Sequence, residues 1–407
     1  MRRMSRRLSG ALIAAALFAA AGGIPSAPAR ADDTIKIGEI NSYSALPSFT
    51  EPYRKGWQLA VEEINAAGGV DGKKLEVISK DDGGKPAEAV TQANELVAND
   101  GVVMLAGTFF SNIGLAVADY AKQKKILFLA GEPLTDAITL SKGNKYTFRL
   151  RPSNYEQAAM LADEAAKLPA KKWATIAPNS EYGQSAVAVF KALLSKKRPD
   201  IQWVGEQWPP QGKIDAGAVS EAIARTEPDA ILNVCFGPDL VKLVREGNTR
   251  GLFKDRAVVS FLTGEPEYLD PLKDETPTGW IVTGYPWNDV KIPAHAAFLK
   301  AYQAKYNDYP RLGSVVGYSE MKAAAAILAK AKSTDSDKLV AAAEGVKVDT
   351  PFGEITFRPS DHQSTLGAFV GKTAVKDGKG VMTDTVYHDG ADFLPSEADV
   401  AAQRPKD

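Results

Sequence analysis

Residues 56–82, GWQLAVEEINAAGGVDGKKLEVISKDD, carry the clearest pattern in the chain. Apolar residues recur at i, i+3, i+4 and i+7, the spacing of one buried helix face: Trp57, Ala60, Val61 and Ile64. Gly68 and Gly69 follow, and glycine ends helices because it takes the left-handed conformation without a Cβ clash. Residues 74–78 then read as a short apolar strand. The stretch therefore predicts one α/β unit: a helix, a glycine stop and a strand.

The same alternation continues in both directions from this unit. Apolar runs that predict strands lie at 35–40, 102–105, 125–130, 173–177, 201–207, 230–234, 257–262, 280–284 and 366–370, with helical patterns between them. Strands that alternate with helices predict parallel βαβ units with right-handed crossovers. The pattern restarts near residue 150, so we expect two α/β lobes that face a cleft. Ligands of such sheets bind beyond the carboxyl ends of the strands.

The N-terminus predicts export. Four arginines precede an uncharged apolar run at 10–24, and Ala29-Arg30-Ala31 has the small-x-small pattern of a signal peptidase site. We expect cleavage after Ala31 and a periplasmic location. An uncleaved anchor is the weaker alternative, because spanning a bilayer takes about 20 apolar residues. Ser5-Arg6-Arg7 leaves the choice between general secretion and twin-arginine export open.

Composition narrows the function further. The net charge of −1 gives no electrostatic reason to bind nucleic acid. The only cysteine, Cys235, lies in an apolar run and is expected to be a buried small hydrophobe. The histidines lack a metal-ligand spacing: His295, His362 and His388. We therefore expect no cofactor, no metal site and no enzymatic activity.

The opening helix, with residues 81–84, 148–152 and 179–183, closely resembles the leucine/isoleucine/valine-binding type of extracytoplasmic solute-binding protein. The resemblance extends from about residue 34 to about 369. It implies two Rossmann-like lobes with parallel central sheets, joined by a three-strand hinge near 150–152, 283–286 and 357–361. The implied division is a signal peptide at 1–31, lobe 1 at 32–150 and 285–358, lobe 2 at 151–284 and 359–395, and a polar, mobile tail at 396–407. It also implies an ABC permease as partner, and a monomer is usual for the family.

The resemblance places two ligand loops on lobe 1. The first runs from Gly107 to Asn112, where Ser111 at a helix start would bind a ligand carboxylate, since helix N-termini offer unpaired N–H groups and partial positive charge. The alternative for Ser111 is a plain N-cap, worth about 1 kcal/mol. The second loop departs from the family, because Glu132 and Leu134 occupy positions where relatives carry small residues and threonine. Glu132 would hold an ammonium group or serve only as a capping or solvent-facing acid.

On lobe 2, the resemblance makes Tyr182 the tyrosine that closes over the ligand. Phe236 matches another cleft aromatic, usually tyrosine. The acid that receives the ligand ammonium is expected near Thr263, with Glu265 two residues further on. An apolar or aromatic side-chain pocket is expected to be lined by Phe49, Phe109, Phe110 and Tyr43.

These features predict the capture of a small carboxylate by hinge closure, for delivery to a permease. Family frequency favours a hydrophobic or branched-chain amino acid. The departures at Glu132, Leu134 and Thr263 favour an aromatic or other organic acid that lacks the amine. A ligand-sensing receptor for a membrane signalling partner is the remaining alternative.

Overall fold

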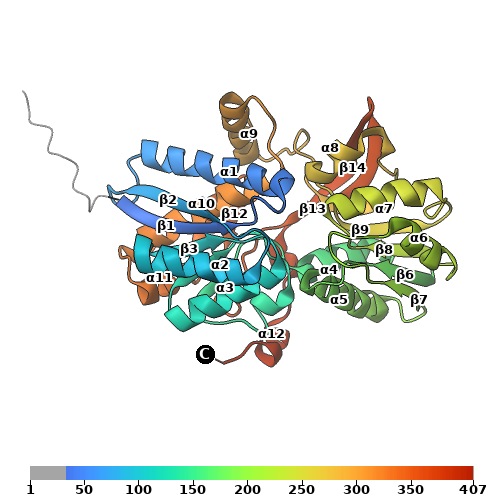
Figure 1. Cartoon of the computed structure of the whole chain (residues 1–407), viewed down its shortest axis with the longest axis horizontal. Helices are drawn as coiled ribbons and strands as arrows, with labels where there is room; N and C mark the ends of the chain where they lie inside the picture. Colours follow the sequence, from blue (N-terminus) through green and yellow to red (C-terminus); the bar gives the residue numbers. More distant parts are fainter. Residues whose placement is uncertain (1–33, 407) are drawn as a thin grey trace, which may run out of the picture.

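The computed structural model describes residues 34–406, so the predicted signal peptide and cleavage site lie outside the described part of the chain. Two α/β bodies stand side by side, each built around its own sheet (Figure 1). We name the body with the five-stranded sheet lobe 1 and the body with the seven-stranded sheet lobe 2. The fold class predicted from the alternation of strands and helices is confirmed.

The sheet of lobe 1 has the order β2-β1-β3-β4-β5 and is parallel throughout. Its strands are β1 (Thr34–Asn41), β2 (Lys74–Asp81), β3 (Met104–Gly107), β4 (Leu127–Ala130) and β5 (Thr147–Arg149). Neighbouring residues of β3 pack into different hydrophobic cores on the two faces of the sheet. Met104 packs with α1 (Pro47–Ala66) and α10 (Leu312–Ala331), whereas Leu105 packs with α2 (Pro86–Glu95) and α3 (Ser111–Lys124). Both faces are therefore covered, as a parallel sheet requires.

Helices α1 and α10 pack against each other at unusually close range. A Cβ on Gly317 would lie 2.2 Å from the backbone oxygen of Tyr53, and one on Gly56 would lie 2.0 Å from that of Ser314. No side chain fits at either position. The predicted glycine stop is also present, because α1 ends at Ala66 and is followed by Gly68 and Gly69 at φ angles of 104° and 75°.

We expect Gly317→Ala to lower the free energy of unfolding by about 2 kcal/mol. Overpacking costs up to about 3 kcal/mol, and the better helix propensity of alanine returns about 1 kcal/mol. Urea unfolding of the purified protein measures the loss. The matched control is Gly72→Ala, where φ is 78° and no atom lies within 4 Å, so only backbone strain of about 1 kcal/mol applies. Equal losses in the two variants would contradict the close packing of α1 and α10.

The sheet of lobe 2 has the order β14-β13-β10-β9-β8-β6-β7. Its strands are β6 (Lys172–Ile176), β7 (Gln202–Gln207), β8 (Ala230–Asn233), β9 (Ala257–Gly264), β10 (Ile281–Gly284), β13 (Ala368–Lys376) and β14 (Lys379–His388). The first five are parallel, and β13 and β14 join as antiparallel strands at one edge. Its helices are α4 (Asn154–Ala165), α5 (Glu181–Lys197), α6 (Ala216–Ala224), α7 (Gly237–Thr249) and α8 (Pro266–Leu272).

The chain passes between the lobes more than once. It leaves the first sheet after β5, and it leaves the second after β10 for α9 (Pro293–Tyr306), α10 and α11 (Ser336–Ala343). It returns to the second sheet at β13, and on the way Arg149 bridges Gln363. Helix α10, which follows β10 in the chain, packs against α1 beside the first sheet. The residue boundaries given above stay a prediction.

Three local expectations need correction. Helix α1 begins at Pro47, ahead of residue 56 where the stretch that predicted it starts, because proline suits the first turn of a helix. A hairpin of β11 (Lys347–Thr350) and β12 (Gly353–Thr356) was not foreseen. The tail is not without structure: α12 (Glu397–Gln403) is capped by Ser396, and Arg404 donates hydrogen bonds to the backbone of Thr139, Asn144 and Asp361.

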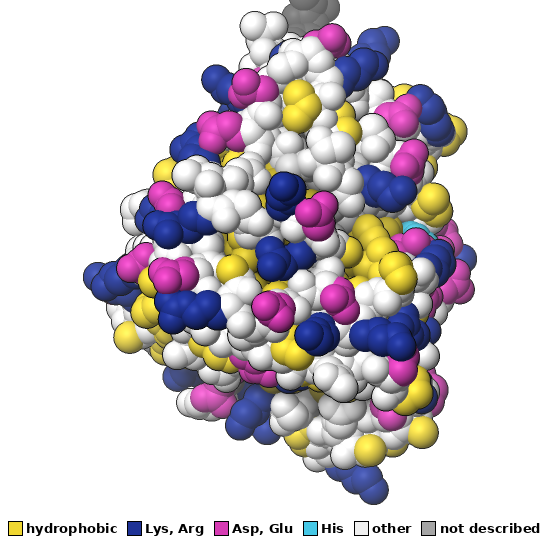
Figure 2. Space-filling model, turned by 90° about the vertical axis from the view of Figure 1, so that its right-hand side faces the viewer, with side chains coloured by type: hydrophobic (Ala, Val, Ile, Leu, Met, Phe, Trp, Pro, Cys, Tyr) yellow, Lys and Arg dark blue, Asp and Glu magenta, His cyan; other side chains and the backbone are white. Residues whose placement is uncertain are grey.

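The outer surface of lobe 2 mixes both signs of charge. Figure 2 shows Lys and Arg side chains interspersed with Asp and Glu over this face, without a large area of one sign. Between residues 34 and 406, no helix is long and apolar enough to cross a bilayer.

Candidate functional site

A pocket between the lobes brings together eight of the ten predicted site residues. It encloses about 470 Å³, part of it open to solvent. The predicted residues that line it are Phe49, Phe109, Phe110, Ser111, Glu132, Leu134, Tyr182 and Phe236. Most of them follow β3, β4 and β8, or begin α5, so they lie at the carboxyl ends of the two sheets, where parallel sheets place their ligands.

Ser111 has a different local role from the one considered in sequence. Phe110 occupies the N-cap position of α3, without a side-chain hydrogen bond, and Ser111 is the first helical residue. Its hydroxyl oxygen accepts the backbone N–H groups of Leu134 at 3.3 Å and Thr135 at 3.2 Å. The plain N-cap interpretation is therefore wrong. A hydroxyl that accepts two hydrogen bonds still has its own hydrogen to donate, and Ser111 lines the pocket.

The loop before Ser111 is held in a strained conformation. Thr108 has a φ of 64°, which is rare for a β-branched residue. Its backbone N–H bonds to the oxygen of Ile40, and its buried side-chain oxygen has no partner within the described residues. This turn brings Phe109 and Phe110 to the pocket. Strain of this kind is found at ligand sites, where the surrounding structure holds it.

Aromatic rings form most of the pocket wall, and they meet across the two lobes. Phe49 on lobe 1 lies 5.1 Å from Tyr268 on lobe 2, and Phe109 lies 6.4 Å from Phe236. Tyr182 meets Phe236 edge to face at 5.5 Å. Tyr43 is not part of this wall, because it accepts a hydrogen bond from Trp57 within lobe 1.

Tyr182 carries a polar atom without a partner. Its side chain is 7% exposed, and its hydroxyl has no hydrogen bond within the described residues. Burial raises the pKa of Tyr182 above its usual value, so the group stays a neutral hydroxyl. A buried donor at a pocket wall is satisfied when a ligand accepts from it.

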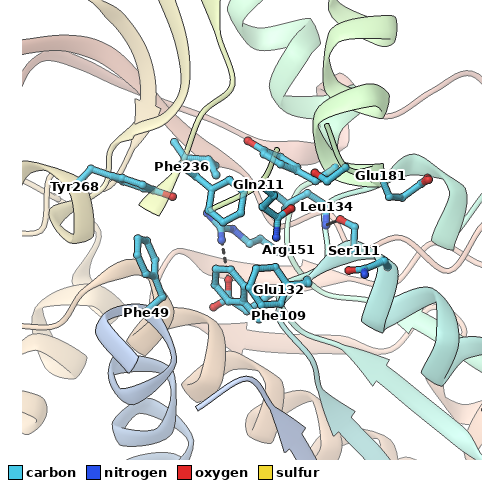
Figure 3. Close-up of a pocket in the computed structure, with 15 residues that line it drawn as sticks. Phe49, Phe109, Ser111, Glu132, Leu134, Arg151, Glu181, Gln211, Phe236 and Tyr268 are labelled. Carbon is cyan, nitrogen blue, oxygen red and sulfur yellow. Dashed lines mark hydrogen bonds and ion pairs between the residues drawn. The ribbon is translucent and has the colours of Figure 1, made fainter. Parts of the chain in front are cut away.

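The charged part of the pocket is an ion triad that the sequence did not reveal. Arg151, just after β5, donates Nη1 to Glu132 at 2.7 Å and Nη2 to Glu265. The side chain of Arg151 is only 7% exposed, and those of Glu132 and Glu265 are 3% exposed each. Figure 3 shows the Arg151–Glu132 pair as a dashed line at the centre of the pocket. Since Glu132 follows β4 and Glu265 follows β9, Arg151 joins the two lobes.

Two carboxylates share this one guanidinium, and that sets their protonation. Burial raises the pKa of Glu265 well above its usual value, against the lowering effect of Arg151, and Glu267 and Glu132 raise it further. Burial also raises the pKa of Glu132. Burial lowers the pKa of Arg151, but the charges of Glu265 and Glu132 outweigh it, so the net shift is upward. Arg151 therefore stays charged beside two acids whose pKa values are raised by burial.

Thr263 and Glu265 do not line the pocket. The Thr263 hydroxyl lies 2.6 Å from that of Ser260 in the interior of lobe 2. Leu262 faces the pocket instead. It has a φ of 63°, and the pairing of β9 with β10 is irregular beside it. A backbone irregularity of this kind changes which residues of a strand face each side, so Leu262 takes the place in the cleft where the resemblance put Thr263. Glu265 reaches the site only through Arg151.

Several lining residues were absent from the sequence prediction. They are Asn112, Arg151, Ser180, Glu181, Gln211, Leu262 and Tyr268. Glu181 opens α5, and its Oε1 accepts the Thr135 hydroxyl of lobe 1 at 2.8 Å. Arg151 had one available signal: two acids predicted in one apolar cleft, Glu132 and Glu265, require a cation nearby. The other residues lie in loops or at the ends of helices and of β9, where tertiary packing decides which side chains face the pocket.

The histidines serve in packing. His362 stacks on Phe148 at 3.9 Å, and His295 contacts Tyr285. In the described part of the chain, no cluster of three or more His, Cys, Asp or Glu side chains is arranged to hold a metal ion. Cys235 is buried next to the pocket wall, and burial raises the pKa of its thiol.

Two lobes, parallel sheets and an inter-lobe pocket define the class of the solute-binding proteins of ABC transporters. The chain belongs to the periplasmic binding protein family, whose model, "Periplasmic binding protein", matches residues 34–379. It is a binding protein and not an enzyme.

Some similar proteins are named for branched-chain amino acids, and another was solved with an aromatic acid. The Leu/Ile/Val-binding protein homolog 7 of Brucella suis is 27% identical over 402 residues, covering 94% of this chain and 96% of that protein. An ABC-type branched-chain amino acid transporter of Rhodopseudomonas palustris CGA009 is 25% identical, with a TM-score of 0.73 over 91% of this chain and all of that one. A solute-binding protein of R. palustris BisB5, solved with 3,4-dihydroxybenzoic acid, shares the fold with a TM-score of 0.79 at 24% identity, covering 88% and 98%.

Proposed function

We propose that this protein captures an aromatic carboxylic acid without an α-amino group and delivers it to an ABC permease from the periplasm. The observation that carries the proposal is the Arg151 triad. Glu132 and Glu265 are the acids expected to hold a ligand ammonium, and both are engaged by one guanidinium. Neither is free to neutralise a ligand cation.

The carboxylate would bind at the start of α3. Ser111 has a hydroxyl hydrogen left to donate, and the first N–H groups of a 14-residue helix carry partial positive charge. In Figure 3, Ser111 lies at one end of the pocket, and Phe49 and Tyr268 lie at the other. A ligand with its acid at Ser111 therefore points its apolar part toward the aromatic rings.

The aromatic wall supports a flat ring as that apolar part. Six lining side chains are aromatic: Phe49, Phe109, Phe110, Tyr182, Phe236 and Tyr268. Edge-to-face contacts between rings add about 0.5–1.5 kcal/mol beyond area burial. The bound 3,4-dihydroxybenzoic acid in the R. palustris BisB5 protein gives one example of this ligand class within the fold.

A second candidate ligand is a hydrophobic amino acid, and Glu181 favours it. Glu181 lines the pocket near Ser111, and only its Oε1 has a partner, Thr135, among the described residues. Its other oxygen is available to an ammonium group. The names of the Brucella suis relative and the R. palustris CGA009 protein also point to branched-chain amino acids.

Calorimetric titration with matched ligand pairs tests the proposal. Each pair differs only by the amine: 3-phenylpropionate against phenylalanine, and 4-methylpentanoate against leucine, with benzoate as a rigid acid. We expect 3-phenylpropionate or benzoate to bind at least tenfold more tightly than either amino acid. Tighter binding of phenylalanine or leucine, abolished by Glu181→Gln, would establish the amino-acid alternative and contradict the proposal.

A further inference from the structure

The pocket contains more acids than bases. Arg151 is the only lysine or arginine among the described residues that line it. Glu132 and Glu265 both bond to it, and Glu181 lines the pocket a short distance away. The partial charge of the α3 N-terminus adds about half a unit of positive charge. The closed pocket is thus already negative when all of its acids are ionised.

A carboxylate ligand adds one more negative charge to this enclosed space. At low dielectric, the attraction between opposite charges is stronger, and so is the repulsion between like charges. Two carboxylates that share a site do not both stay ionised when a third approaches. The excess negative charge is removed most directly by protonating Glu132 or Glu265, which already have the Arg151 guanidinium at hydrogen-bond distance.

We propose that the pocket takes up one proton together with its carboxylate ligand, and that this proton resides on Glu132 or Glu265 beside Arg151. The inference rests on the proposed function, since it requires an anionic ligand group. One proton enters from solvent with the ligand, and the same proton returns to solvent when the lobes open and release it. No bond other than the carboxyl O–H forms or breaks.

The groups that face the triad reinforce this assignment. Glu267 on α8 accepts the backbone N–H of Gly313, and burial raises its pKa to about 7. Glu320 on α10 accepts from Tyr53 and from the N–H of Gly107, and burial raises its pKa to about 8.

The phenols of Tyr182 on α5 and Tyr268 on α8 stay neutral, because burial raises the pKa of each. None of these four neighbours supplies a positive charge. Among them, Glu267 raises the pKa of Glu265 and so favours the protonated form of the Glu132–Glu265 pair.

The inference fixes the sign of the pH dependence. The affected acid binds its proton more tightly in the liganded, closed state than in the ligand-free, open state, because the open state lacks the negative charge of the ligand. Below its pKa in the open state it is protonated in both states, and the dissociation constant is flat. As the pH rises through the window between the two pKa values, the ligand binds more weakly, by up to tenfold per pH unit.

The first experiment is calorimetric titration with 3-phenylpropionate and benzoate at pH 5.5 to 8.5, in phosphate and in Tris. These buffers release different heats on ionisation, so the difference in apparent enthalpy counts the protons taken up. We expect 0.5 to 1 proton per ligand near neutral pH, a dissociation constant that rises with pH, and loss of both effects in Glu265→Gln. Glu132→Gln is the second variant, should the first fold poorly. Zero uptake with a flat dissociation constant would overturn the inference while the proposed function stands.

The second experiment needs no ligand, so it separates failure of the inference from failure of the proposed function. Urea unfolding of the wild type and of Glu265→Gln is compared from pH 5 to 8. A buried acid with a raised folded-state pKa stabilises the protein at low pH and loses that stabilisation as the pH rises. We expect the wild type to lose more stability than the variant over this range. Parallel curves would refute the proton site, even if neither 3-phenylpropionate nor benzoate binds to the protein.

Discussion

Arg151→Met is expected to lower the free energy of unfolding by about 3–5 kcal/mol at pH 8. Removing one partner of a buried ion pair leaves an uncompensated charge, and here it leaves two, on Glu132 and Glu265. Methionine fills similar volume, so the loss is electrostatic. Urea unfolding at pH 8 and pH 5 measures it, and we expect a smaller loss at pH 5. The reason is that the two acids, with their pKa values raised by burial, are then protonated.

Arg245→Met is the matched control for this variant. Arg245 pairs with Glu275 at 2.7 Å, but the side chains are 51% and 45% exposed. Ion pairs this exposed contribute little to stability, because water screens them. If the two arginine variants lost the same stability, the triad would not hold the lobes as described.

Ser111→Ala is expected to weaken ligand binding about ten- to hundredfold, because a hydrogen bond to a charged group contributes about 1.5–3 kcal/mol. The same change removes the acceptor of the Leu134 and Thr135 N–H groups, so some stability is lost as well. Calorimetric titration with the best ligand of the matched pairs measures the change in affinity.

Ser153→Ala separates the two effects. Ser153 is also a buried serine at a helix start, where it caps α4 by accepting the N–H of Glu156, and it does not line the pocket. We expect a stability loss of about 1 kcal/mol with unchanged affinity. If Ser111→Ala retained full affinity, the carboxylate would bind elsewhere.

The fold was predictable from sequence because its signals are local. The helix that ends before Gly68 shows its buried face through residues at most seven positions apart, and each strand is a single apolar run. The start of α3 at Ser111 was predictable for the same reason. Residue types at one position and its near neighbours decide such features.

The charged centre of the site was not predictable in this way. Arg151 lies 19 residues from Glu132 and 114 from Glu265, so no spacing in the chain pairs them. Thr263 was placed near the ligand by the family resemblance, but the backbone turns at Leu262, which has a positive φ, and Leu262 lines the pocket instead. Both depend on tertiary structure: the first on how two lobes meet, the second on a backbone irregularity that side-chain identities do not signal.

The contact between α1 and α10 also constrains the order in which the chain folds. Tyr53 on α1 donates a hydrogen bond to Glu320 on α10, 267 residues away. Contacts between distant segments form late, because closing a long loop costs entropy before any packing is gained. Strands β6 to β9, by contrast, come from one continuous segment. The face of the first sheet that α1 and α10 cover together therefore stays incompletely covered until α10, which begins at Leu312, has been synthesised. Until then, the apolar residues of that face are open to chaperones and proteases.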